Sequence, residues 1–213
     1  MNHKKSLYEK FIKRPQDLIL SLAALVALSP VLFIVAILIK MKLGSPVIFK
    51  QDRPGLNEKA FEMYKFRTMT DERAENGELL PDSVRLTKFG KFLRVTSLDE
   101  LPELWNIARG DMAIVGPRPL LIKYLPYYNN TEKRRHSVRP GLSGLAQVSG
   151  RNNIGWDRRL AKDVEYVNKI TFSSDMKIIF KTLIKSFKRE GVTVVDEAPL
   201  KDLNYERGQS LEN

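Results

Sequence analysis

Residues 18–39 form an uninterrupted run of 22 residues without a charged side chain near the start of an otherwise polar chain. As a straight helix this run would extend about 33 Å, and the hydrocarbon core of a bilayer is about 30 Å thick. The run is therefore long enough to cross a membrane once, to turn back inside it, or to act as a signal sequence. A signal sequence is disfavoured because its apolar core usually has only about 7–15 residues.

Pro30 interrupts the run near its middle and favours a turn inside the membrane. Proline has no N–H, so the carbonyl of Val26 loses its helical hydrogen bond, and the ring clashes with the preceding turn. Ser29 is expected to ease this break by donating to the carbonyl of Leu25. Basic residues flank the run on both sides, which favours two cytoplasmic ends. We therefore predict a re-entrant helix hairpin within residues 1–43, with a proline-kinked spanning helix as the alternative.

The composition excludes several kinds of chemistry. The 213 residues include no cysteine and two histidines, so disulfides and thiolate sites are excluded, and histidine clusters or triads have little material. A net charge of +11 indicates an anionic partner, such as lipid headgroups, phosphates or nucleic acid. Any catalysis would therefore rest on carboxylates, arginines, lysines and backbone groups.

The rest of the chain predicts an α+β fold. One folded domain is expected over residues 44–190, followed by a weakly ordered tail over residues 191–213. Two β-favouring runs at residues 47–51 and 60–65 flank turn-forming residues, which predicts a small antiparallel hairpin. The remaining segments indicate a surface loop or short helix at 70–81, a region at 86–118 that is helical until a Gly-Pro break at Gly116, and a structured glycine-rich loop at 138–151.

Residues 174–189 combine an apolar stripe with a stripe of lysines at helical spacing. This pattern is typical of a basic amphipathic helix that lies at an anionic membrane surface. The same pattern also occurs in helices that pack their apolar stripe on a protein core. Both interpretations remain open from the sequence.

Residues 97–119 carry the candidate catalytic carboxylates. Ser97 and Glu100 have the spacing of a capping box, which predicts the start of a helix. Asp99 and Glu100 would then lie where exposed N–H groups and the helix dipole stabilise anions. Adjacent carboxylates repel each other unless a cation lies between them, and Mg²⁺ shared with substrate phosphates would supply one. Because acidic residues are common in the first turn of any helix, a purely structural role is the alternative.

Several cationic residues accompany these carboxylates. Arg118 lies between two prolines, Arg139 and Arg151 bracket the glycine-rich loop, and Lys65 and Arg67 follow the second predicted strand. Cations, glycines and a carboxylate pair indicate phosphoryl chemistry, which depends on positioning and charge neutralisation. Taken alone, each arginine could instead form a surface ion pair and have no role in phosphate binding.

Six motifs then follow one another along the chain. They read FKQDRPG at 49–55, YKFRTM at 64–69, SLDELP at 97–102, GDM at 110–112, VGPRP at 115–119 and RPG at 139–141, with QV and GR just after. This order resembles the bacterial sugar transferase family, the monotopic polyprenyl-phosphate phosphoglycosyl transferases. The resemblance extends from the apolar run to about residue 189, and the length is similar to that of the short members.

The resemblance implies transfer of a sugar-1-phosphate from a UDP-sugar to undecaprenyl phosphate, with release of UMP. Asp99 would attack the sugar-linked phosphorus and form a covalent phosphosugar-aspartyl intermediate, which the lipid phosphate would then attack. Glu100 would hold Mg²⁺. The lysine that the family has after its second strand corresponds to Lys65, and the arginine of the family's Pro-Arg-Pro motif corresponds to Arg118. A further family aspartate falls on Asp175, for which a helix cap is the alternative.

The resemblance also implies a location and partners. The protein would be monotopic in the bacterial inner membrane, with its catalytic domain on the cytoplasmic face and the break at Ser29 and Pro30 inside the bilayer. Its partners would be the UDP-sugar, undecaprenyl phosphate and membrane lipids, with downstream glycosyltransferases as further candidates and no nucleic acid. The residues do not identify the sugar, although likeness to the short members favours an N-acetylated one.

Three other functions fit parts of the sequence. Phosphosugar transfer could proceed directly, with Asp99 or Glu100 acting only as a metal ligand. A membrane-tethered protein that binds anionic lipid or nucleic acid fits the charge, but the arginines lie beside glycine and proline rather than among aromatic residues. A glycosidase is disfavoured because adjacent helical residues point about 100° apart and do not flank a glycosidic bond.

Overall fold

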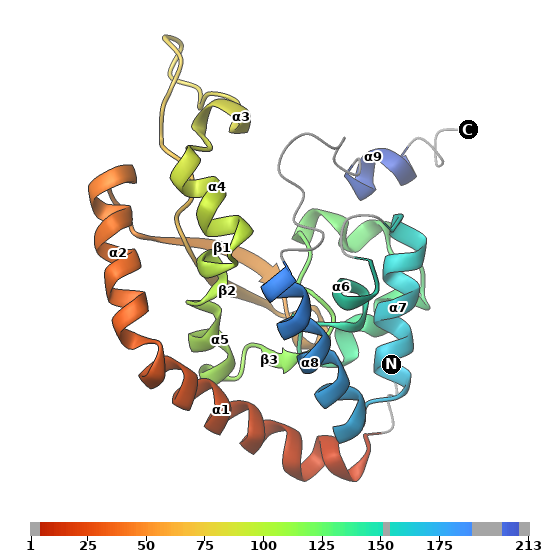
Figure 1. Cartoon of the computed structure of the whole chain (residues 1–213). Helices are drawn as coiled ribbons and strands as arrows, with labels where there is room; N and C mark the ends of the chain where they lie inside the picture. Colours follow the sequence, from red (N-terminus) through yellow and green to blue (C-terminus); the bar gives the residue numbers. More distant parts are fainter. Residues whose placement is uncertain (1–4, 151–153, 189–201, 209–213) are drawn as a thin grey trace.

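The computed structural model describes residues 5–150, 154–188 and 202–208. The N-terminal helices run along the bottom and left of Figure 1, a β-hairpin crosses the middle, and the C-terminal helices lie on the right. Labels beginning with η mark 3-10 helices, except that η1 is a π-helix. In chain order the elements are η1 (Tyr8–Ile12), α1 (Lys13–Ala27), α2 (Ser29–Leu43), β1 (Ile48–Pro54), η2 (Leu56–Glu58), β2 (Ala60–Phe66), α3 (Asp82–Arg85), α4 (Lys88–Val95), η3 (Leu98–Glu100), α5 (Glu103–Arg109), β3 (Ala113–Val115), η4 (Ile122–Tyr127), η5 (Glu132–Ser137), β4 (Gly141–Ser143), α6 (Leu145–Gly150), α7 (Trp156–Asn168), α8 (Phe172–Lys188) and α9 (Leu203–Gly208).

The apolar run folds as two helices that meet at the predicted break. Residues Tyr8–Ala27 and Ser29–Leu43 are bent by 62° relative to each other. Among the described residues, no single helix is long and apolar enough to cross a membrane, and only this bent pair meets the length and composition test. The Ser29 hydroxyl donates to the carbonyl of Val26 at 2.8 Å, so the predicted acceptor, Leu25, is wrong. In a regular helix the N–H of residue 30 would donate to the carbonyl of Val26, and since Pro30 has no N–H, the Ser29 hydroxyl donates to this carbonyl instead.

Polar side chains attach α1 to the rest of the domain. Arg14 donates to the carbonyls of Ile107 and Ala108 at 2.7 and 2.8 Å, at the C-terminal end of α5. The buried carboxylate of Asp17 accepts from the backbone N–H of Ile114 at 3.1 Å. These contacts couple the position of the N-terminal helices to that of α5, which follows the candidate carboxylates in the chain.

The predicted hairpin is confirmed. Strands β1 and β2 pair antiparallel, with Ile48 opposite Phe66 and Pro54 opposite Ala60. The buried side chain of Asn106 on α5 accepts from the N–H of Tyr64 at 3.0 Å and donates to the carbonyl of Glu62 at 2.7 Å. Because Asn106 bonds backbone groups of two residues on β2, α5 is held against the strand that carries Lys65.

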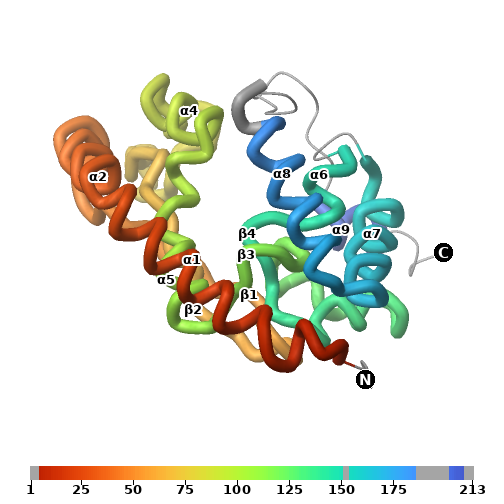
Figure 2. The backbone as a smooth tube through the Cα atoms, turned by 60° about the horizontal axis from the view of Figure 1, so that its bottom comes forward, coloured from red at the N-terminus to blue at the C-terminus, as the bar shows by residue number. Residues whose placement is uncertain are grey.

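Two predictions for the middle of the chain are wrong in part. The region 86–118 is not one helical segment, because Gly110 adopts a left-handed conformation (φ 97°) that ends α5, and strand β3 follows. The glycine-rich region 138–151 contains strand β4, which pairs parallel with β3, and helix α6 (Figure 2). Glycine permits this pairing, since a Cβ at Gly141 would lie 2.0 Å from the nitrogen of Gly116.

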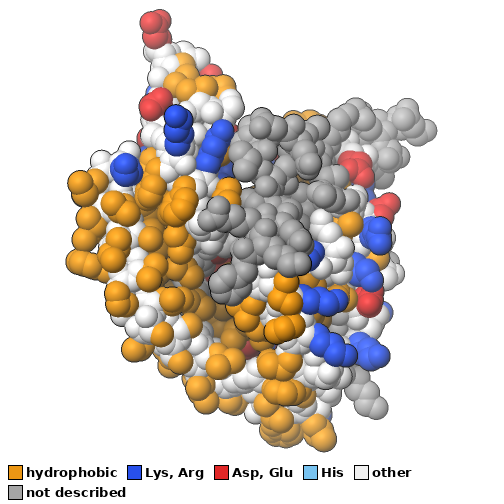
Figure 3. Space-filling view, in the orientation of Figure 1, with side chains coloured by type: hydrophobic (Ala, Val, Ile, Leu, Met, Phe, Trp, Pro, Cys, Tyr) orange, Lys and Arg blue, Asp and Glu red, His pale blue; other side chains and the backbone are white. Residues whose placement is uncertain are grey.

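The predicted amphipathic helix is confirmed as α8. Asp175 and Ile178 face the core, whereas Phe180 is 65 % exposed and Leu183 is 53 % exposed. Most of the apolar stripe is therefore left open to the outside, while a neighbouring face of the helix packs on the domain. Figure 3 shows that apolar side chains gather on one face of the molecule, over α1, α2 and part of α8.

The described part of the C-terminal tail forms the short helix α9, which lies against η4. Leu203 is fully buried in a cluster with Tyr124 and Trp156, and Arg207 pairs with Glu132 at 2.6 Å. This packing orders residues within the segment that the sequence predicts to be weakly ordered. Residues 189–201 and 209–213 lie outside the described residues, so the predicted domain boundaries stay predictions.

Candidate active site

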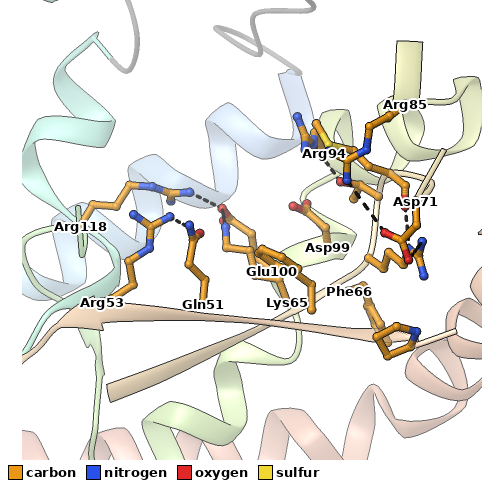
Figure 4. Close-up of a pocket in the computed structure, with 15 residues that line it drawn as sticks. Gln51, Arg53, Lys65, Phe66, Asp71, Arg85, Arg94, Asp99, Glu100 and Arg118 are labelled. Atoms are coloured by element: carbon orange, nitrogen blue, oxygen red, sulfur yellow. Dashed lines mark hydrogen bonds and ion pairs between the residues drawn. The ribbon is translucent and has the colours of Figure 1, made fainter. Parts of the chain in front are cut away.

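A cavity of about 470 Å³ lies between the β-hairpin, the C-terminal end of α4 and η3. Its walls carry three carboxylates, Asp71, Asp99 and Glu100, and an apolar side that includes Phe49 and Phe66. Figure 4 shows Asp99 between two groups of cationic side chains. The cationic residues that line the cavity are Arg53, Lys65, Arg67, Arg85, Arg94 and Arg118.

The two candidate carboxylates lie on the short helix η3 rather than at the start of a longer helix. Ser97, just before it, is a non-glycine residue with a left-handed conformation (φ 55°), and its side chain makes no capping hydrogen bond. The predicted capping box is therefore wrong. Backbone strain of this kind is found at functional sites, where the surrounding structure maintains it. Here the turn presents Asp99 and Glu100 to the cavity.

Glu100 is the centre of an ion cluster. The same carboxylate oxygen, Oε1, lies 2.9 Å from Lys65 Nζ and 2.5 Å from an Arg118 terminal nitrogen. Burial alone would raise the pKa of Glu100, but the positive charges of Arg118 and Lys65 hold this pKa well below its usual range. Glu100 is thus ionised at all ordinary pH values and fixes both cations at one end of the cavity.

Asp99 lies in a different environment, although it is the preceding residue. It is 8 % exposed, and burial together with the negative charge of Glu100 raises its pKa to about 6. The charges of Lys65, Arg118 and Arg94 partly oppose this shift. Asp99 is therefore a poorly solvated carboxylate that is ionised at neutral pH, a state suited to nucleophilic attack on an electrophile bound among these cations.

A further carboxylate, Glu103, belongs to the ion cluster around Lys65, and the sequence did not predict it. It is 2 % exposed, and its Oε1 lies 3.2 Å from Lys65 Nζ. Burial and the negative charge of Glu100 raise the pKa of Glu103 to about 7. Its position three residues after Glu100 was the available signal, since residues at this spacing lie near each other on a helix.

Arg67 lines the cavity as a mainly structural residue. Its guanidinium donates to the carbonyls of Met69 and Ser45 at 2.7 and 2.5 Å and pairs with Asp71 at 2.7 Å. These contacts shape the loop that follows β2.

Three arginines of the cavity, Arg53, Arg85 and Arg94, were not predicted. Arg53 belongs to the FKQDRPG motif, and Arg94 lies five residues before Asp99, so sequence proximity to the motifs was the signal for these two, whereas Arg85 had no such signal.

The structure does not bring Arg139 to the cavity. Its guanidinium lies 3.4 Å from the buried carboxylate of Asp17 on α1, which makes it part of the attachment of the N-terminal helix. Its predicted companion Arg151 lies outside the described residues, so the structure neither brings it to the cavity nor excludes it.

Asp175 also lies away from the cavity. It is 1 % exposed, and its carboxylate accepts from Tyr8 and Tyr166 at 2.9 Å each and from Lys13 at 2.5 Å. It therefore links α8 with the N-terminal helices and α7. The hydrogen bonds that cap α8 come instead from Ser174 and Thr171.

Asp99 and Glu100 could bind a magnesium ion only together with a bound substrate whose phosphates supply further ligands. Among the residues that the structure describes, no group of three or more acidic or histidine side chains is arranged to hold a metal. Mg²⁺ in phosphoryl-transfer sites is commonly bound through one or two carboxylates, with water and substrate phosphates completing the shell. Asp99 and Glu100 border one cavity and meet that smaller requirement.

Comparison with known proteins agrees with the motifs. The family model described as bacterial sugar transferase matches residues 8–189. The chain is 49 % identical over 181 residues to the uncharacterized sugar transferase EpsL of Bacillus subtilis (strain 168), covering 85 % of this chain and 90 % of EpsL.

Two longer relatives have names that state a reaction or a carrier. The UDP-glucose:undecaprenyl-phosphate glucose-1-phosphate transferase of Escherichia coli (strain K12) is 37 % identical over 190 residues, which is 84 % of this chain and 40 % of that protein. The UDP-galactose-lipid carrier transferase of Erwinia amylovora is 37 % identical over 199 residues, or 85 % and 42 %. The chain thus spans less than half the length of these two relatives. From the family match and the extent of these similarities, we conclude that the chain belongs to the bacterial sugar transferase family.

Proposed function

We propose that this protein transfers a sugar-1-phosphate from a UDP-sugar to undecaprenyl phosphate and releases UMP. The observation that carries the proposal is the buried carboxylate of Asp99, which borders a cavity whose walls bear six cationic side chains. A diphosphate donor needs such charge neutralisation, and a nucleophile beside it needs to be positioned and poorly solvated. The names of the related lipid-carrier transferases support the same reaction class.

The chemistry that fits these residues has two displacements at one phosphorus atom. A carboxylate oxygen of Asp99 attacks the phosphorus that carries the sugar, the bond from this phosphorus to the UMP oxygen breaks, and UMP leaves with the electron pair. A phosphate oxygen of undecaprenyl phosphate then attacks the same phosphorus and displaces Asp99. The covalent intermediate allows a soluble donor and a membrane-bound acceptor to use one site in turn. Arg118 and Lys65, which Glu100 orients, would neutralise the phosphate charge.

The proposal includes Mg²⁺ at Glu100, beside Asp99. When bound, Mg²⁺ would neutralise charge on the donor phosphates. The same cation would weaken the repulsion between the two carboxylates and so favour the ionised form of Asp99. Removal of divalent cations with EDTA should therefore abolish UMP release, and added Mg²⁺ should restore it. UMP release that persists in EDTA would contradict this part of the proposal.

We further propose that the protein is attached to one leaflet of the bacterial inner membrane, with the catalytic domain on the cytoplasmic face. The exposed apolar side chains of α1, α2 and α8, such as Val26, Phe33 and Phe180, support this proposal. Contiguous apolar surface on this scale normally contacts a membrane or another protein. Attachment there would bring the site to the level of the lipid phosphates, and products would pass to downstream glycosyltransferases.

The direct test measures UMP release by the full-length protein in detergent, with Mg²⁺, undecaprenyl phosphate and a panel of UDP-sugars. The panel includes UDP-glucose and UDP-galactose, which the relatives' names suggest, and N-acetylated sugars. Asp99→Asn and Glu100→Gln should remove activity, whereas Glu62→Gln, an exposed carboxylate on the same hairpin, should not. A folded wild-type protein that releases no UMP from any donor would refute the proposed transfer.

Direct transfer without an intermediate is distinguished by omitting the lipid acceptor. In the covalent route, wild-type protein and UDP-sugar alone should release one UMP per active site, and intact mass measurement should show the added sugar phosphate. Asp99→Asn should show neither. If UMP appears only when undecaprenyl phosphate is present and no mass is added, transfer is direct.

A further inference from the structure

The backbone around Arg118 has few groups by which it can be held. Pro117 and Pro119 have no N–H, so this segment is fixed mainly through its carbonyls. The carbonyl of Pro117 accepts from the N–H of Gly141 at 3.0 Å, beside the β3–β4 pair. The carbonyl of Arg118 accepts from the side chain of Arg135 at 2.6 Å. A side chain thus holds the backbone of the residue whose guanidinium contacts Glu100.

Arg135 is itself held tightly. Its Nε and one terminal nitrogen donate to the same oxygen of Asp163 at 3.0 and 2.8 Å, and the two side chains are 1 % and 3 % exposed. The guanidinium lies over the ring of Tyr128, with 5.6 Å between its central carbon and the ring centroid. The other terminal nitrogen lies 3.4 Å from His136 Nε2. The guanidinium therefore has contacts in its plane and on one face, which fix its direction.

A contribution to the stability of the fold does not by itself explain the buried pair of Arg135 and Asp163. The desolvation of a buried arginine and aspartate offsets most of their attraction, and well-packed apolar residues often serve as well. An apolar side chain, however, cannot donate to the carbonyl of Arg118. Arg135 does not line the cavity, so it does not contact substrate there.

We propose that Arg135 and Asp163 are positioning residues that fix the backbone at Arg118 and thereby direct its guanidinium toward Glu100 and the donor phosphates. The chain of contacts runs from Asp163 on α7, through Arg135 on η5, to Arg118 and then to Glu100 on η3. This inference rests on the proposed function, in which Arg118 neutralises phosphate charge. It assigns a catalytic consequence to α7 and η5, which contribute no residue to the cavity.

The test is a double-substitution cycle on the full-length protein in detergent, with UMP release as the readout. Arg135→Lys keeps the charge beside Asp163 but removes the planar group that donates to Arg118. We expect kcat/KM to fall about 10- to 100-fold, as for a misplaced positioning group. In an Arg118→Ala background, the same change should lower kcat/KM less than about twofold, because its target is absent. Equal losses in both backgrounds would overturn the proposal.

Two further variants separate positioning from folding. Asp163→Asn loosens Arg135 without altering the segment that holds Arg118, and it should show the same dependence on background. If Arg135→Lys does not fold, Asp163→Asn tests the positioning role in its place. Arg134→Lys is the matched control, because this neighbouring arginine donates instead to Asn168 at 2.5 Å. Its activity should equal that of the wild type.

UMP binding, measured by calorimetry, separates the failure of this inference from the failure of the proposed function. Arg118→Ala and Arg135→Lys should each weaken UMP binding, and the double variant should bind no more weakly than Arg118→Ala. If UMP binding shows this pattern but no UDP-sugar is turned over, the transferase proposal fails and the positioning role stands. If Arg135→Lys binds UMP as tightly as the wild type, the positioning role fails.

Discussion

Replacing Asp99 by asparagine should make the folded protein more stable while it abolishes transfer. The pKa of Asp99 is raised from 3.8 to about 6, mainly by burial, so the folded state binds a proton more tightly than the unfolded state does. At about 1.4 kcal/mol for each unit of pKa, the ionised carboxylate destabilises the folded state by about 3 kcal/mol above pH 6. Asparagine is never charged, so Asp99→Asn avoids this cost.

The expected rise in Tm at pH 7.5 is about 6–12 °C for a chain of this length. As the pH falls through the folded-state pKa, the wild type takes up a proton and the difference between the two proteins shrinks. Most of the difference should be lost by pH 4, and it should vanish below about pH 3, where Asp99 is protonated in both states. The assay is thermal unfolding of the detergent-solubilised proteins between pH 4 and pH 8.

Glu100→Gln is the matched control for this prediction, because the adjacent carboxylate has its pKa shifted downward by Arg118 and Lys65. A depressed pKa means that the ionised form stabilises the folded state at neutral pH, and this stability is lost only as the pH falls through the folded-state pKa. Glu100→Gln should therefore lower Tm at pH 7.5. The reasoning is refuted if Asp99→Asn leaves Tm unchanged or lowers it, or if its effect is the same at pH 4 and pH 8.

Three further predictions follow from the site and the helix break. The logarithm of kcat/KM should fall with a slope approaching one as the pH falls through the pKa of Asp99, which is about 6 without Mg²⁺ and lower with Mg²⁺ bound, because Asp99 must be ionised to attack; a profile that stays flat down to about pH 4 would exclude it as the titrating nucleophile. Lys65→Gln should lower both activity and Tm, since it leaves Glu100 and Glu103 facing each other, whereas Lys50→Gln, at an exposed pair on the same hairpin, should change Tm by less than about 2 °C. In the double variant with alanine at Ser29 and Pro30, the helix pair should straighten and carry the N-terminus to the opposite side of the membrane. Because the chain has no cysteine, labelling of a single cysteine introduced at the N-terminus reports this change, and unaltered labelling would count against it.

Several elements were readable from local sequence. Pro30 removes a backbone donor wherever it occurs, so the break between α1 and α2 followed from chemistry alone. The hairpin followed from two β-favouring runs around a turn, and the α8 helix followed from its period. The carboxylate pair and Arg118 followed from the family motifs. In each case the information lies within a short stretch of chain.

Other predictions failed because they depended on backbone geometry or on distant partners that a local pattern does not determine. The expected capping box at Ser97 would have required helical geometry after it, but a left-handed turn and a short 3-10 helix occur instead. The glycine-rich region contains a strand because Gly141 can approach Gly116, and no local pattern announces a parallel partner that far along the chain. Side-chain direction was also unreadable, so Arg139 was expected at the site although it pairs with Asp17 on α1.

The sequence by itself determined which chemistry was available: an apolar run broken by Pro30, no thiol, and a carboxylate pair accompanied by arginines. Only the tertiary structure decided how that chemistry is distributed. It gave Asp99 and Glu100 opposite pKa shifts, because Asp99 is buried next to the negative charge of Glu100, whereas Glu100 is only partly buried and pairs directly with Lys65 and Arg118. Solvation and charge–charge energies depend on distances between groups far apart in the chain, and these distances exist only after folding.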